Sequence, residues 1–75
     1  MKLDATIKRG EDGWFVTRDF AGVPVWGSGP TRLAAVVDYL GSLLDALKLL
    51  SDDEARLHPR MKQHLDAIRA TLEEA

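Results

Sequence analysis

The stretch Ile7-Lys8-Arg9-Gly10-Glu11-Asp12-Gly13-Trp14-Phe15-Val16 decides the fold, because it joins two extended segments through a tight reversal. Residues 2–8 alternate polar and apolar side chains, which is typical of a half-buried strand. The Asp12-Gly13 pair favours the positive φ angles of a hairpin turn. Residues 14–20 are rich in aromatic and β-branched side chains and predict the returning strand.

One face of the returning strand must point into the core, and both faces carry an aromatic ring. We expect Trp14 and Val16 to point inward, because that choice also buries Phe20. Ala21-Gly22 then permits a second reversal into a short third strand over residues 23–26.

A long helix is predicted over residues 31–50. Gly27-Ser28-Gly29-Pro30 forms a turn, and Thr31 is a good N-cap directly before an apolar run. Steps of three and four residues place the large apolar side chains on one helix face. They are Leu33, Val36, Val37, Leu40, Leu43, Leu44, Leu47 and Leu50.

The C-terminal residues 51–75 predict a second, kinked helix. Ser51-Asp52-Asp53-Glu54 matches a capping box at its start, and Pro59 divides or kinks it near His58. Four apolar residues form a narrow stripe, which we expect to contribute to the interface of a homodimer. They are Met61, Leu65, Ile68 and Leu72.

Seventy-five residues form one domain, with residues 1–30 as its sheet part, 31–50 as its main helix and 51–75 as its C-terminal helix. The predicted fold class is α+β, with a three-stranded antiparallel sheet, a long helix on one face and a kinked helix beside it. Without cysteine, disulfide frameworks and thiolate metal sites are excluded. No apolar segment suits a signal peptide or a membrane span, so a cytoplasmic protein is expected.

The titratable and nucleophilic residues lack the spacing of a catalytic or metal site. His58 and His64 are six positions apart and fall on different helix faces, so a metal site is not expected. We interpret His58 as a residue beside the Pro59 break and His64 as a partly solvated helix residue. Ser28 lacks the glycine pattern of a nucleophile elbow. The chain is therefore expected to be non-enzymatic and to hold no cofactor.

The four aromatic residues of positions 14–26 leave three roles open: core packing, base stacking and contact with a protein. The net charge of −2 and the pairing of Arg18 with Asp19 disfavour direct nucleic-acid binding. The candidate residues for contact with a partner protein are Trp26, Tyr39 and Arg18.

Residues 3–50 resemble the HicB-like antitoxins, which have a partial ribonuclease-H-like fold. The similarity rests on the hairpin Ile7–Val16 and on Gly29-x-Thr31 followed by Ala35, Val36 and Leu40. The resemblance implies a protein that neutralises a small ribonuclease, a HicA-like toxin, by direct binding, and that assembles as a dimer or tetramer. Residues 51–75 lack a basic recognition helix, so operator binding is not expected. The alternative hypothesis is a standalone regulatory or phage-type protein that binds another cellular protein.

Overall fold

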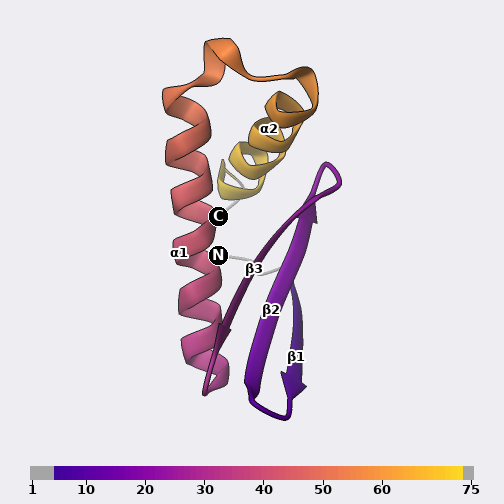
Figure 1. The fold of residues 1–75 in the computed structure, drawn as a ribbon, viewed down its shortest axis with the longest axis vertical. Helices are drawn as coiled ribbons and strands as arrows, with labels where there is room; N and C mark the ends of the chain where they lie inside the picture. The colour runs from indigo at the N-terminus through magenta and orange to yellow at the C-terminus, as the bar shows by residue number, and fades with distance from the viewer. Residues whose placement is uncertain (1–4, 74–75) are drawn as a thin grey trace.

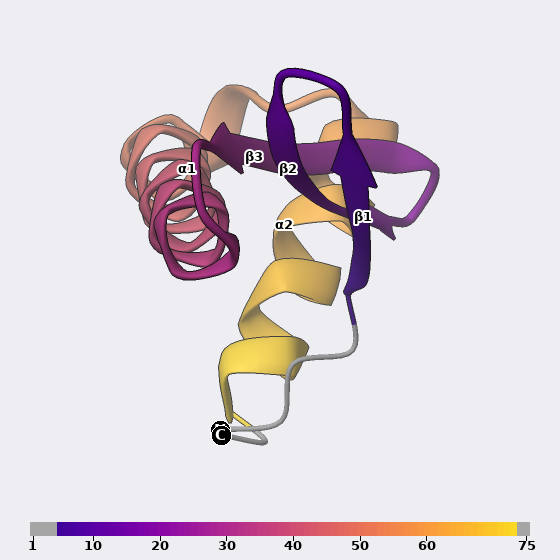
Figure 2. The same cartoon turned by 90° about the horizontal axis from the view of Figure 1, so that it is seen from below.

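The computed structural model describes residues 5–73 and has the predicted α+β architecture, a three-stranded antiparallel sheet followed by two helices (Figure 1). The sheet order is β1-β2-β3. Both helices lie on the same side of the sheet (Figure 2). The elements are β1 (Thr6–Gly10), β2 (Gly13–Phe20), β3 (Val23–Gly29), α1 (Arg32–Asp52), a 3₁₀ turn (Glu54–Arg56) and α2 (Pro59–Glu73). Residues 2–4 of the predicted first strand lie outside the described residues.

Two short turns set the register of the sheet. Gly10 pairs with Gly13 across the first turn, as the hairpin pattern predicted. Phe20 pairs with Val23 across the second, where Ala21 and Gly22 both have positive φ angles of 54° and 83°. Two positive φ angles define a type I′ turn, whose twist matches that of the flanking strands. The third strand extends to Gly29 and is therefore longer than predicted.

The inner face of β2 is the predicted one. Val16 is 0% exposed and Phe20 is 2% exposed, and both contact the core that the helices close. Trp14 lies on the same face and is half-buried. Thus the parity that buries Phe20 is confirmed, and Phe15 on the opposite parity stays 44% exposed.

The axis of α1 runs beside β3 at backbone contact distance, and Gly27 makes this possible. A Cβ atom at Gly27 would collide with the backbone nitrogen of Tyr39 and would lie 2.6 Å from its Cα. Real Cβ atoms do not approach other atoms closer than 3.0 Å. Glycine at this position therefore fixes how closely the helix packs on the sheet.

This close approach rotates α1 away from its predicted orientation. The residues buried against the sheet are Ala35, Tyr39 and Leu43. Leu33, Val37 and Leu44, which were predicted to face the core, are 73%, 60% and 55% exposed. Ala35 is 0% exposed, and its backbone nitrogen would lie 2.8 Å from a Cβ atom at Gly29, so α1 is close to β3 at this position as well. The larger residues consequently lie on the flank and on the outside of the helix.

The boundary between the helices also differs from the prediction. Ser51 lies inside α1, which continues to Asp52, so the predicted capping box at Ser51-Asp52-Asp53-Glu54 is wrong. Leu50, in this last turn of α1, packs against the core. The break at Pro59 is confirmed, because Pro59 is the first residue of α2, where its missing amide hydrogen costs nothing.

The apolar stripe of α2 is used inside the chain. Leu65 and Ile68 are both 0% exposed, and Leu72 packs at the edge of the core. The predicted homodimer interface on Met61, Leu65, Ile68 and Leu72 is therefore wrong for Leu65 and Ile68, which have no surface left for a second subunit. The physical reason is that α2 folds back into the space between α1 and the sheet (Figure 2).

A polar bridge fixes the returning helix. The Arg69 guanidinium on α2 donates to Ser51 Oγ at 3.1 Å and to Glu54 Oε1 at 2.8 Å. It thereby links α2 to the end of α1 and to the 3₁₀ turn. This contact holds the pKa of Glu54 below its usual value, mainly through the hydrogen bond from Arg69.

The outer edge of β3 offers few free backbone donors. The Ser28 amide donates to Asp38 Oδ2 of α1 at 2.8 Å, so this amide points away from β2. Pro24, four residues earlier, shares that direction by the two-residue period of the strand and has no amide hydrogen. The edge is thus protected against pairing with another strand.

Neither helix of the described residues is long and apolar enough to cross a membrane.

Candidate functional site

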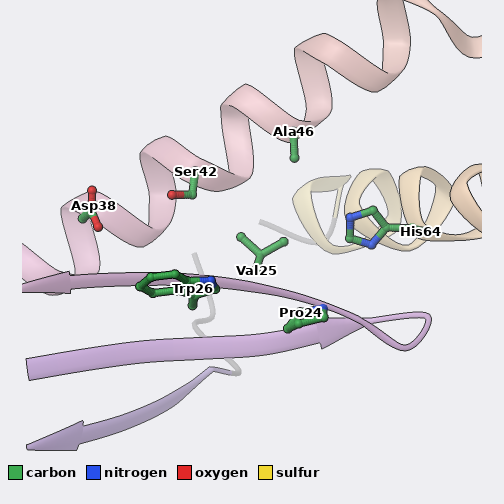
Figure 3. Close-up of a pocket in the computed structure, with 7 residues that line it drawn as sticks. All are labelled: Pro24, Val25, Trp26, Asp38, Ser42, Ala46 and His64. Atoms are coloured by element: carbon green, nitrogen blue, oxygen red, sulfur yellow. The ribbon is translucent and has the colours of Figure 1, made fainter.

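A groove of about 400 Å³ lies beside the outer edge of β3, between that strand and the two helices (Figure 3). We call it the β3–α1 groove. Its lining combines an aromatic ring, a carboxylate, a hydroxyl and an imidazole with apolar side chains. The residues are Pro24, Val25, Trp26, Asp38, Ser42, Ala46 and His64.

Trp26 connects this groove to the free face of the sheet. Its neighbours in β3, Val25 and Gly27, are buried, so the alternation of the strand turns Trp26 outward, where it is 61% exposed. Thr17 pairs with Trp26, and Phe15 pairs with Ser28, which places Phe15 on the same face as a diagonal neighbour of Trp26. Two exposed aromatic rings therefore share the face that neither helix covers.

Asp38 is held at one end of the groove by the strand itself. Its Oδ2 atom accepts the 2.8 Å hydrogen bond from the Ser28 amide, which orients the carboxylate toward β3. Ser42 lies one turn further along α1, on the same side as Asp38 (Figure 3). Asp38 is the one Asp or Glu among the lining residues, and Lys and Arg are absent from that lining. The groove therefore carries a local negative charge and suits a cation.

His64 forms the other end, and sequence reasoning misplaced it. The side chain was expected to be partly solvated, but it is 3% exposed. Its Nδ1 lies 2.7 Å from the Phe20 carbonyl oxygen, which accepts only, so Nδ1 is the donor. The ring also meets Phe20 edge-on, with centroids 6.2 Å apart. Position 64 lies three residues after Met61 of the apolar stripe. This helical spacing is the sequence feature that places His64 on the inner face of α2.

The imidazole acts as a structural link in this arrangement. It connects the middle of α2 to the end of β2, just before the second turn. Figure 3 shows Val25 and Ala46 between Ser42 and His64, so the hydroxyl and the imidazole are not adjacent. Over residues 5–73, the structure contains no group of three or more His, Cys, Asp or Glu side chains that suits a metal ion.

Of the three predicted partner contacts, the structure places Trp26 at the groove and the other two elsewhere. Tyr39 is 2% exposed and belongs to the core, so its predicted contact with a partner is wrong. Arg18 is half-buried on the inner face of β2, with its guanidinium 5.0 Å from the Phe20 ring centroid. Burial raises the pKa of the Tyr39 hydroxyl, and the charge of Arg18 offsets part of that rise.

Comparison with known proteins adds no relative to these observations. No family model, curated protein or solved structure matches the chain. Its function must therefore be inferred from its own residues and their geometry.

Proposed function

We propose that this chain is a non-catalytic protein-binding module that neutralises a small ribonuclease toxin by direct binding. The observation that supports the proposal most is Trp26, a large aromatic side chain that is 61% exposed beside a groove. The order β1-β2-β3-α1 agrees with the hairpin-to-helix order on which the resemblance to the HicB-like antitoxins rests.

Trp26 has the properties of an interface anchor. Tryptophan residues are enriched among the side chains that dominate binding energies, and they act by entering pockets that exclude water. Phe15 extends the apolar surface along the uncovered face of the sheet. A partner that covers this face buries the exposed parts of both rings, which are 61% of Trp26 and 44% of Phe15.

The groove also specifies the charge of the partner. The Asp38 carboxylate and the Trp26 ring both line it, and a Lys or Arg side chain interacts favourably with a carboxylate and with an indole face. A ribonuclease presents basic side chains because it binds a phosphate backbone. We therefore expect a Lys or Arg of the toxin to enter the β3–α1 groove.

Co-expression with a HicA-like ribonuclease tests this proposal. The wild-type chain is expected to restore growth and to co-purify with the toxin. Trp26→Ala should lose both effects, and Asp38→Asn should weaken them, because the amide keeps an acceptor for Ser28 but lacks the charge. Asp66→Asn, an exposed carboxylate on α2, is the matched control and should protect fully.

Two results would count against the proposal. Growth arrest that the wild-type chain does not relieve, with no complex recovered, would exclude the antitoxin role for the ribonuclease used. Full protection by Trp26→Ala and Asp38→Asn together would keep the role but exclude the groove. Circular dichroism of each variant establishes that the fold is retained.

A standalone regulatory protein is the second candidate. It is favoured by α2, which is bound to its own core through Leu65 and Ile68 and does not project as a separate nucleic-acid-binding part. This hypothesis predicts that the chain relieves no ribonuclease toxicity and that Trp26→Ala abolishes its binding to a purified cellular protein. The same groove is then used, with a different basic partner.

A further inference from the structure

We propose that α1 pairs in antiparallel orientation with α1 of a second copy of this chain. The contact surface is one stripe of α1, which we call the α1 stripe. Its members are Leu33, Val37, Leu40, Gly41, Leu44 and Lys48. At 100° per residue, these positions fall within about 100° of helix circumference. This surface is separate from the β3–α1 groove and goes beyond the proposed toxin binding.

The α1 stripe is apolar and uncovered. Leu33 is 73% exposed, Val37 60% and Leu44 55%, and they recur at the spacing of one helix face. Leu40 is half-buried and joins them to the core. An exposed row of this kind is unusual on a helix that is permanently solvated.

Gly41 is the feature that points to a second helix. A glycine inside a helix is less favourable than alanine, so the chain carries it at a cost. A Cβ atom at Gly41 would meet nothing within 4 Å, so packing inside the chain does not require the glycine. Its absence of a side chain makes a shallow hole halfway along the α1 stripe, and such a hole can receive a large side chain from a facing helix.

The spacing of the α1 stripe is the same when read in either direction from the point between Leu40 and Gly41. A two-fold axis through that point places Leu40 over Gly41 of the partner subunit, and Val37 over Leu44 of the partner subunit. At each end, Leu33 lies along the aliphatic stem of Lys48 of the partner subunit. Large residues thus oppose small ones at the centre, and the interface is self-complementary, as a two-fold dimer requires.

The exposed side chains of the α1 stripe fit this occupant. Leu33, Val37 and Leu44 are each more than half exposed, and the same stripe on a second copy is apolar and matches them in spacing. Leu65 and Ile68 of α2 are already buried in the core, so α2 has no second apolar face that could cover the α1 stripe.

Analytical ultracentrifugation from low micromolar to near millimolar concentration tests the proposal. The wild-type chain is expected to dimerise reversibly within that range. Gly41→Leu should weaken the dimer at least tenfold because it fills the hole, while the folded monomer tolerates it because the space is open within one chain. Val37→Glu should abolish the dimer. Leu49→Glu, which is 70% exposed on another side of α1, is the matched control and should leave the dimer intact.

Cross-linking distinguishes the orientation. The chain has no cysteine, so the double variant Val37→Cys with Leu44→Cys carries the only two thiols. Antiparallel pairing predicts disulfides between position 37 of one copy and position 44 of the other, read by mass spectrometry of the linked peptides. A wild-type monomer at the highest concentration, a Gly41→Leu dimer as tight as wild type, or links only between identical positions would overturn the proposal.

Discussion

Gly27→Ala tests the closest contact in the fold, that between β3 and α1. The added Cβ would lie 2.6 Å from the Cα of Tyr39, whereas ordinary contacts begin at 3.4 Å, so the backbones must separate by at least 0.8 Å. Because the obstructing atoms belong to the backbone, they do not rotate away. The cost of such overpacking is about 3 kcal/mol. Alanine recovers about 0.5–1 kcal/mol of strand propensity.

The expected net loss is therefore about 2–2.5 kcal/mol, from a total stability of roughly 4–11 kcal/mol for a chain of this length. Urea unfolding followed by circular dichroism at low micromolar concentration measures it. Gly41→Ala is the matched control, because the same substitution in open space should stabilise α1 by about 1 kcal/mol. If Gly27→Ala unfolds at the wild-type urea midpoint or above it, the close packing of α1 on β3 is refuted.

Three further predictions concern titration and turn geometry. Tyr39 is the only tyrosine, so its ultraviolet titration should have a higher midpoint in the folded chain than in concentrated guanidinium. Equal titration midpoints in the folded and unfolded chain would contradict the burial of this side chain. The contribution of Tyr39 to stability is present below its unfolded pKa, near 10.0, and is lost as the pH rises above that value. Glu54 contributes stability above its unfolded pKa, near 4.5, which is lost as the pH falls through the lower folded value. Arg69→Gln should return the NMR titration midpoint of Glu54 to normal, and an unchanged midpoint would exclude the bridge. Ala21→Asn should raise the free energy of unfolding by roughly 0.5–1 kcal/mol, since asparagine tolerates a positive φ better than alanine, and a lower value would argue against the type I′ turn.

The sheet was predictable because its signals are local. Alternation and turn residues placed the hairpin around Gly10 and Gly13, and burying Phe20 chose the correct parity of β2. Pro59 marked the start of α2 because a missing amide hydrogen acts at its own position. Each of these signals depends on a few neighbouring residues.

The orientation of α1 was not predictable in the same way. Its apolar residues cover more than one face, so periodicity alone fits several rotations of the helix. The choice depends on Gly27, which is far away in sequence and admits the helix backbone beside β3. That contact places Ala35 and Tyr39 inside and leaves Leu33 and Val37 outside.

The candidate site was predictable only in part. Trp26 was identified because four aromatic residues cluster within positions 14–26, and one of these rings was expected to contact a protein. Asp38 and His64 were missed as site residues, because each depends on a contact between distant elements, the Ser28 amide and the Phe20 carbonyl. Ser51 was assigned to a cap because the local pattern is strong, whereas α1 continues through Ser51 to Asp52, with Leu50 packed against the core.

The protected edge of β3 limits how this fold can polymerise. Pro24 and the Asp38 bond to Ser28 close one side of the sheet, while β1 pairs only with β2 among the described residues. Another strand can therefore add to the sheet at the outer edge of β1. If two copies joined through their β1 edges, the combined sheet would end at a β3 strand on both sides, and each end would carry the proline and the Asp38 contact that disfavour further pairing. Edge pairing in this fold thus favours a closed pair over growth into a fibril.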